Sequence, residues 1–512
     1  MATAAPDGDE DGEPAETGAQ IAARLEWQAT AVAVAVLAMA AALVGSLAWP
    51  LVAPALQALT GSGAEGPLPL HHRWHAPARV RRETWDAARG NLADWVAATR
   101  ADEPVVLAAT PASKWRAVRR WGPAYLAEHA AGLNVSTVLG AHTVFQYWNH
   151  EMAGWAAPAL EACAGRWRRC ILPSPGGTLA PEPLAMAEFW RRAAGAGAGT
   201  APLLYGSAKL GPADFDSELL RDDLRGAAAW LGPSPVTAAP ATIKWQLWLG
   251  GGNVTSQTHY DEDANVHTVL HGTKRFLLGR PTAAHAAHLF PRVHGCRRHS
   301  MVEFEPGAAA QPGLTFTFEA AELADGPVEV VEAVLRPGEA IYIPPFWLHR
   351  VESREQAVAV SVWWAGPHSV VIAALKRQIE ATADLIDAAW PLPTRAALLK
   401  LQLDALAPPG WGALPRLLAQ RYRPLYGPEA DGVEDFVGWC TPGALLDAQE
   451  RAGAAARRAL DAAAAESKRL LGQLEDPAVR LTVLQDEAEL LLGSELGVGR
   501  IHAFLLGCYG QR

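Results

Sequence analysis

Two histidines and one aspartate in the middle of the chain have the residue types and spacing of a metal site. His259 and Asp261 stand two positions apart in His-Tyr-Asp, and His349 follows much later in the segment PPFWLHRVES. Two imidazoles and one carboxylate on one face of an octahedral ion leave positions open for a chelating cosubstrate and O2, as in non-haem Fe(II) oxygenases. The pattern therefore predicts iron held by His259, Asp261 and His349. A lone His-x-Asp pair arises by chance, with a satisfied surface histidine as the usual alternative, so the surrounding elements must support the site.

Short β-prone runs surround these three residues and are separated by Gly, Pro and Asn turns. Residues two apart on a strand point to the same side, so His259 and Asp261 can both face into a β core. Short strands of this kind favour an antiparallel barrel or jelly roll. The runs are residues 202–210, 243–249, 264–270, 274–278, 328–335, 340–344 and 357–364.

A lysine at the start of one of these runs indicates an anionic ligand. Lys274 lies fifteen residues after His259, just beyond the turn His271-Gly272-Thr273. A lysine that points into a β core needs an anion, because a buried lone ammonium is very costly. The alternative is a lysine at a strand start with its head in water.

These motifs together resemble a known family. The segments GNVTSQTHYDEDANVHTVLHGTKRFLL and PGEAIYIPPFWLHRVES resemble the cupin-like JmjC oxygenases, most closely the asparaginyl hydroxylase that modifies hypoxia-inducible factor. The resemblance covers residues 83–366. It implies a mainly β core, a double-stranded β-helix or jelly roll with flanking α-helices, that uses Fe(II), the cosubstrate 2-oxoglutarate and O2.

The resemblance also implies roles for other residues, position by position. Lys274 and Tyr205 match residues that bind the distal carboxylate of 2-oxoglutarate, and Asn265 matches a polar residue near its chelating end. A hydroxyl just before the triad is also expected to bind this distal carboxylate. Because the segment here is one residue longer than the family pattern, the hydroxyl could belong to Thr255, Ser256 or Thr258. Ser361 replaces an expected asparagine.

Arg298 and His299 align loosely with substrate-contacting positions. The alternative for these two residues is a solvated basic loop. Trp347 and Trp363 are expected to exclude water from the pocket.

The family resemblance implies hydroxylation of a protein side chain. No catalytic residue is expected beyond the metal ligands. Lysine demethylation and RNA hydroxylation are alternatives, although the formal net charge of −10 provides no basic surface for nucleic acid. A cupin-fold protein that binds metal or acts as a scaffold without turnover is the alternative of another class. The intact ligands and Lys274 argue against it.

The amino-terminal region predicts a membrane anchor. Residues 1–28 are acidic and Ala/Gly-rich, typical of a disordered tail, and residues 29–49 form an uncharged apolar run. As a helix this run is about 32 Å long, enough to cross a bilayer core, so a single transmembrane helix is expected. A cleaved signal peptide and an Ala-rich core helix are the alternatives. Residues 50–82 have the composition of a linker.

The charges around the expected anchor favour a cytosolic body. Only Arg24 precedes the apolar run as a basic residue, whereas several arginines follow it, which places the body in the cytosol by the positive-inside rule. The N-glycosylation motifs at Asn134 and Asn253 would be modified only if the body were lumenal.

Residues 367–512 predict a helical region for packing or for a homodimer contact. The chain contains five scattered cysteines, which do not indicate a disulfide framework. They are expected to be free thiols. Cys163 and Cys170 flank a basic stretch and could be bridged in an oxidising compartment.

Overall fold

The computed structural model describes residues 78–510, with gaps at 87–89, 100–101, 141–143, 146–181, 196–202, 211–221, 226, 232–243, 302–329, 408–409 and 411. The expected acidic tail and transmembrane helix, and residues 50–77 of the expected linker, lie outside the described residues. Within the described part, no single helix has both the length and the apolar composition to cross a membrane. Only the pair Pro477–Leu496 and Val498–Tyr509, bent by 110°, meets that test together.

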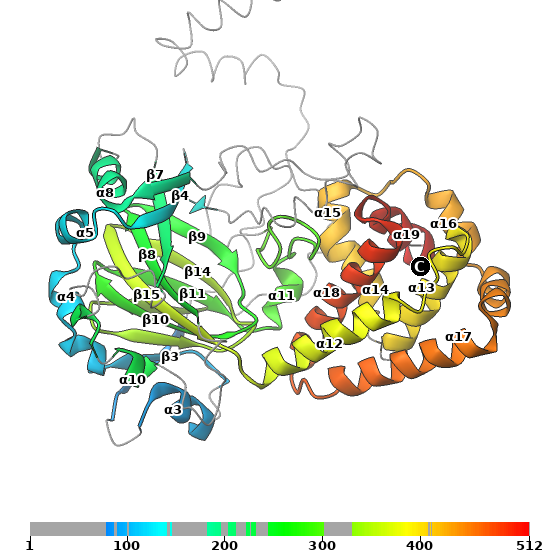
Figure 1. Cartoon of the computed structure of the whole chain (residues 1–512), viewed down its shortest axis with the longest axis horizontal. Coiled ribbons are helices and arrows are strands. Elements are labelled where there is room, and N and C mark those ends of the chain that lie inside the picture. Colours follow the sequence, from blue (N-terminus) through cyan, green and yellow to red (C-terminus); the bar gives the residue numbers. More distant parts are fainter. Residues whose placement is uncertain are drawn as a thin grey trace, which may run out of the picture. The chain divides into compact units, whose positions relative to one another are not determined.

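Two β-sheets form the core of the amino-terminal half (Figure 1). The larger sheet has the strand order β2 (Arg81–Thr84), β3 (Val105–Ala108), β13 (Ala340–Ile343), β10 (Ala264–His271), β15 (Gln356–Trp364), β8 (Lys244–Gly251), β7 (Leu203–Lys209), β4 (Asn134–Gly140) and β6 (Glu182–Ala185). The smaller sheet has the order β1 (Ala78–Arg79), β12 (Val330–Leu335), β11 (Lys274–Gly279), β14 (Leu348–Ser353), β9 (Val254–His259) and β5 (Val144–Phe145). The β1–β12, β2–β3 and β5–β9 pairs are parallel and the other described pairs are antiparallel, so the core is mixed.

The expected β-prone runs correspond to β7, β8, β10, β11, β12, β13 and β15. Strands β9 and β14, which carry His259 and His349, were not among them. Strand β9 has the sequence Val-Thr-Ser-Gln-Thr-His. It is mostly polar, so the pattern of apolar runs does not predict it. Strands β1 and β2 begin inside the segment expected to be a linker. Arg81 pairs with Val105, and Ala78 pairs with Val331.

Helices cover the outer face of the larger sheet (Figure 1). Trp95, Trp115 and Trp121 from these helices share one hydrophobic cluster with Val266 and Val360 of the central strands. This packing makes β10 and β15 the rigid middle of the sheet, because their residues are buried on both faces. The helices are α3 (Leu92–Thr99), the 3₁₀ turn η3 (Pro111–Lys114), α4 (Arg116–Arg120), α5 (Pro123–His129), α8 (Met186–Gly195) and α10 (Ala227–Leu231); the short helix α11 (Ala283–Ala286) follows β11.

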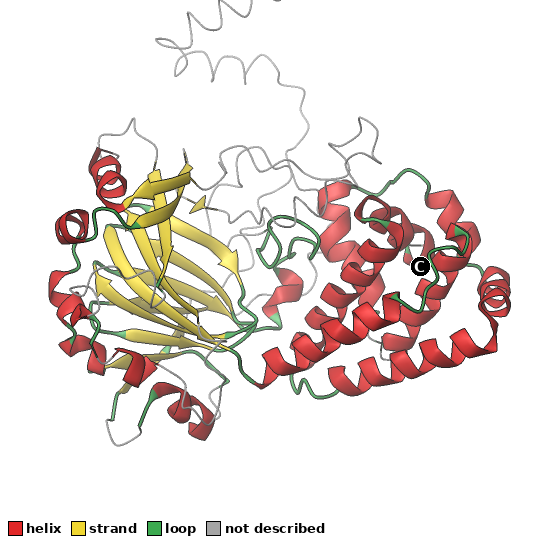
Figure 2. Cartoon of the chain, in the orientation of Figure 1, coloured by secondary structure: helices red, strands yellow, loops and turns green. Residues whose placement is uncertain are grey.

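From residue 367 the described chain is helical, as expected (Figure 2). Its elements are α12 (Pro367–Ala383), α13 (Leu392–Leu406), α14 (Ala413–Leu417), the π-helical turn η6 (Leu418–Tyr422), α15 (Arg423–Tyr426), α16 (Val433–Trp439), α17 (Pro442–Leu471), α18 (Pro477–Leu496), the 3₁₀ turn η7 (Val498–Arg500) and α19 (Ile501–Tyr509). Asp476 caps α18 by accepting hydrogen bonds from the backbone of Ala478 and Val479. The helices share a hydrophobic cluster with Tyr260 and Phe346 of the β core. A homodimer contact through them stays a prediction.

Two cysteines of the helical region form a disulfide. Cys440, at the end of α16, is bonded to Cys508 in α19, with their Cα atoms 5.4 Å apart. The expectation that the cysteines are all free thiols is therefore wrong for this pair. The sequence alone does not predict this disulfide, because the two cysteines are 68 positions apart and form no local motif. Cys296 is a buried free thiol, and Cys163 and Cys170 lie outside the described residues.

Candidate metal centre

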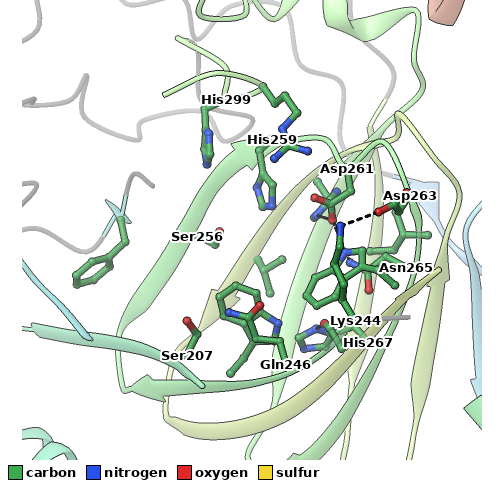
Figure 3. Close-up of a pocket in the computed structure, with 18 of the residues that line it drawn as sticks. Ser207, Lys244, Gln246, Ser256, His259, Asp261, Asp263, Asn265, His267 and His299 are labelled. Carbon is green, nitrogen blue, oxygen red and sulfur yellow. Dashed lines mark hydrogen bonds and ion pairs between the residues drawn. The ribbon is translucent and has the colours of Figure 1, made fainter. Parts of the chain in front are cut away.

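The three predicted metal ligands lie together at one end of the β core. His259 ends β9 and pairs directly with His349 on the neighbouring antiparallel strand β14, while Asp261 follows β9 by two residues. Their ligand atoms all lie within 4.8 Å of one another, and His349 Nε2 is 3.7 Å from Asp261 Oδ2. Across the described part of the chain, this is the one group of three such side chains close enough to hold an ion. Figure 3 shows His259 and Asp261 beside the pocket.

Backbone carbonyls fix the orientation of both imidazoles. His259 Nδ1 lies 2.7 Å from the carbonyl oxygen of Gln257, and His349 Nδ1 lies 2.9 Å from that of Trp347. A carbonyl only accepts, so each Nδ1 carries the proton and each Nε2 keeps a free lone pair for a metal. Burial holds the pKa of His259 well below its usual value, which favours the neutral ring that binds metals.

The third ligand is held by two donors. Asp261 Oδ2 accepts hydrogen bonds from Trp363 Nε1 at 2.8 Å and from Asn265 Nδ2 at 3.2 Å. Burial raises the pKa of Asp261, but the adjacent His349 and His259 outweigh it and hold the pKa below its usual range. The carboxylate is therefore ionised and ready to bind a cation.

A cavity of about 390 Å³ opens beside the triad, between the inner faces of the two sheets (Figure 3). The smaller sheet contributes Ser256, Phe276 and Val351 to its lining. The larger sheet contributes Tyr205, Gln246, Trp248, Asn265, His267, Ser361 and Trp363. An aromatic and partly polar cavity that reaches a metal site can hold a small polar ligand in a largely dry environment.

Lys274 lies next to this cavity but is not part of its lining. It precedes Phe276 by two residues on β11, so both side chains point inward, and its Nζ is 6.0 Å from the centre of the Tyr205 ring. The side chain is 0% exposed, and Nζ has no hydrogen-bond partner among the described residues. Burial lowers the pKa of Lys274 to about 7. An unpaired buried ammonium fits a site for a carboxylate.

Tyr205, the aromatic neighbour of this lysine, also contacts Ser256. The Tyr205 ring stacks on Trp248, with 5.6 Å between centroids, and its hydroxyl forms a hydrogen bond with Ser256. Of the three hydroxyls left open by the sequence, Ser256 is the one in the cavity lining. Thr255 pairs with Glu352 in the β9–β14 ladder, and Thr258 is fully buried.

The other predicted residues have different surroundings. Ser361 lines the cavity, but its Oγ lies 2.8 Å from His267 Nδ1. Trp363 lines the cavity, whereas Trp347 is not in the lining and its indole donates to the carbonyl oxygen of Asp102.

The basic segment after α11 reaches the metal site. Arg298 and His299 line the cavity, and the His299 ring stacks on His259 with 5.0 Å between centroids. His299 is buried, so the alternative of a solvated loop does not describe this residue.

Sequence reasoning missed several residues at the site. His267 lines the cavity two positions after Asn265, so strand alternation alone could have found it. Tyr260 and Phe346 hold the segment between the ligands. Their rings stack with centroids 5.1 Å apart, and the Phe346 amide donates to the Asp261 carbonyl at 2.8 Å. No local pattern pairs these two residues.

In a comparison with known proteins, residues 193–369 match the model of the Cupin-like domain family. The chain is 30% identical over 119 residues to the lysine-specific demethylase JMJ31 of Arabidopsis thaliana, covering 23% of this chain and 20% of that protein. It is 30% identical over 125 residues to the Jumonji C domain-containing protein 5 of Drosophila melanogaster, covering 24% and 28%. It is 24% identical over 163 residues to the human bifunctional peptidase and (3S)-lysyl hydroxylase JMJD7, covering 30% and 50%.

The matched stretches span half or less of the length of these relatives. The relatives are named as a lysine demethylase, a Jumonji C protein and a lysyl hydroxylase, so the narrower expectation of an asparaginyl hydroxylase type is not supported. Residues 193–369 thus match the model of the Cupin-like domain family, and the chain is similar in sequence to JmjC demethylases and hydroxylases.

Proposed function

We propose that this chain is an Fe(II)- and 2-oxoglutarate-dependent oxygenase that hydroxylates a protein side chain. The observation that carries the proposal is the ammonium of Lys274, which has no partner among the described residues and is buried in the β core that also holds the His259, Asp261 and His349 triad. A metal site alone is common in cupin folds. A buried cation next to the adjoining cavity is what a dicarboxylate needs in order to bind with its other end at the metal.

Each residue then has a physical task. His259, Asp261 and His349 would hold iron, and Trp363 and Asn265 keep the Asp261 carboxylate in place. Lys274, with Tyr205 and Ser256 nearby, would bind the distal carboxylate of 2-oxoglutarate. Trp248 and Phe276 keep water away from that end of the cavity. When bound, iron and 2-oxoglutarate supply the oxidation, in which O2 gives one oxygen atom to a substrate C–H bond and one to succinate, with release of CO2.

The choice of a protein substrate is supported by the named activities of the relatives. Two of them carry names that specify lysine as the residue acted on. Hydroxylation and oxidative demethylation begin with the same attack on a C–H bond, so the geometry at iron serves both. The acidic balance of the chain, with a net charge of −10, makes RNA a poorer substrate.

Succinate formation by the full chain tests the proposal. Purified protein with Fe(II), 2-oxoglutarate and O2 is expected to form succinate, and His349→Ala is expected to abolish this turnover. Lys274→Ala is expected to weaken 2-oxoglutarate binding roughly thirty-fold or more, because it leaves a buried carboxylate unpaired. Lys114→Ala, at an exposed lysine outside the cavity, is the matched control. Absence of succinate from the wild type, or full turnover in His349→Ala, would favour the non-catalytic cupin alternative.

A further inference from the structure

His267 is a buried histidine that points into the cavity and has no role in the metal site. It lies in the middle of β10, two residues after Asn265 and on the same inner face, and is 5% exposed. Directly opposite it on β15 is Ser361. Both residues line the cavity, and Figure 3 shows His267 below Asn265 at the end away from His259.

The ring of His267 is fixed on two sides. Its Nδ1 lies 2.8 Å from Ser361 Oγ, and the ring packs edge-on against Phe276, with 5.2 Å between centroids and 70° between planes. Its Nε2 is buried and has no hydrogen-bond partner in the described structure. A buried polar atom without a partner is costly, and one that lines a cavity is typical of a site where a ligand supplies the missing partner.

The ring has one proton to place. Burial, and then the nearby Lys274 ammonium, hold the pKa of His267 well below its usual value, so the ring is neutral. The Ser361 hydroxyl can donate to Nδ1, which puts the ring proton on Nε2. An N–H at this position needs an acceptor, and Lys274 Nζ also lacks a partner among the described residues. One carboxylate can satisfy both donors.

We propose that His267, oriented by Ser361, is a further hydrogen-bond donor to the distal carboxylate of 2-oxoglutarate, beside Lys274. This inference rests on the proposed function. It gives Ser361 a positioning task through His267 in place of a direct contact with the cosubstrate. The alternative is a core histidine that only fills space between Phe276 and the larger sheet.

The test measures ligand binding without turnover. The full chain is loaded with Mn(II) under anaerobic conditions and titrated by calorimetry with 2-oxoglutarate and with 2-oxobutyrate, which keeps the chelating end but lacks the distal carboxylate. His267→Leu is expected to raise the Kd for 2-oxoglutarate roughly tenfold, the loss of about one hydrogen bond to a charged group. The Kd for 2-oxobutyrate and the affinity for Mn(II) are expected to stay within twofold.

Conservative variants separate donation from packing. His267→Gln places an amide N–H near the position of Nε2 and is expected to recover most of the lost affinity, while Ser361→Ala should give a smaller loss than His267→Leu. His267→Gln also keeps the test valid if the leucine variant does not fold. Equal weakening of both ligands, or no recovery in the glutamine variant, would assign His267 to packing and overturn the inference.

Lys274→Ala distinguishes this inference from the proposed function. If Lys274→Ala weakens 2-oxoglutarate binding and His267→Leu does not, the role of His267 is wrong and the proposed function stands. If neither variant weakens binding, the cosubstrate assignment itself is wrong.

Discussion

The hydroxyl of Tyr260, the residue between two of the candidate metal ligands, donates a hydrogen bond of 2.8 Å to Asp486 Oδ2 on α18. Both side chains are buried, at 2% and 5% exposure. Arg421 Nη1 lies 2.6 Å from Asp486 and 2.8 Å from Glu489, so the carboxylate that receives the tyrosine is itself held by an ion pair. The carboxy-terminal helices therefore contact the segment that carries the ligands directly. Packing or dimerisation alone does not describe them.

Tyr260→Phe should lower both stability and metal affinity. The change removes one buried hydrogen bond to a charged acceptor, for a loss of about 1.5–3 kcal/mol in the free energy of unfolding. It also frees the segment that positions His259 and Asp261, so the affinity for Co(II), followed by its visible absorption, should fall several-fold. Urea denaturation of the metal-free protein measures the first effect.

Tyr422→Phe is the matched control for this prediction. Tyr422 donates to Glu489 in the same buried network, at 3.0 Å, but does not adjoin a metal ligand. The Tyr422→Phe variant should have a lower free energy of unfolding, while its affinity for Co(II) should stay unchanged. Equal Co(II) affinity in both variants and in the wild type would show that the helices do not position the ligands.

Glu487 should make the protein less stable as pH rises. Burial raises the pKa of this carboxyl to about 8, and its Oε2 has no hydrogen-bond partner in the part of the chain described. Between pH 4.5 and about 8 the folded state thus binds more protons than the unfolded state, so the free energy of unfolding falls across this window, by up to about 1.4 kcal/mol per pH unit. Glu487→Gln should raise the unfolding temperature more at pH 8 than at pH 5.5. The exposed Glu475→Gln should show no such difference.

Lys274 should make 2-oxoglutarate binding dependent on pH. Because burial lowers its pKa to about 7, the lysine must take up a proton above pH 7 in order to pair with the carboxylate. The affinity should therefore fall as pH rises from 7 to 9, by up to about tenfold per unit. Calorimetry in buffers of different ionisation enthalpy would measure the proton uptake. Lys274→Arg should bind more weakly but lose this slope, because a guanidinium stays charged. A slope that survives in Lys274→Arg would assign the proton to another group.

The sequence predicted the parts of the site that follow from local spacing. The side-by-side placement of His259 and Asp261, and the inward direction of Lys274, depend on the two-residue period of a strand. The contacts that orient these residues could not be predicted, because they join distant segments. Tyr260 and Asp486 are 226 positions apart, and His267 and Ser361 are 94 apart. Nor does either pair have a charge or spacing pattern that distinguishes it from surface residues.

The disulfide bears on the side that the body would face if residues 29–49 anchor the chain in a membrane. Disulfides persist in oxidising compartments and are rare in the cytosol, so Cys440–Cys508 favours a lumenal body over the cytosolic one that the arginines suggested. Those arginines begin at Arg73, beyond the window of about 15–20 residues from the apolar run in which the positive-inside rule applies. On this basis we expect a lumenal body.

Glycosylation would reveal this location. The sequons at Asn134, at the exposed start of β4, and at Asn253, in the exposed turn between β8 and β9, should be modified when the full chain is made in eukaryotic cells. A glycosidase should then lower the apparent mass, and Asn134→Gln and Asn253→Gln should each remove part of that shift. Cys440→Ser should make the Cys508 thiol available to alkylation under non-reducing conditions, one thiol more than in the wild type. If protease added outside intact vesicles digests the body, and glycosidase does not change its apparent mass, the body lies in the cytosol and the lumenal expectation is wrong.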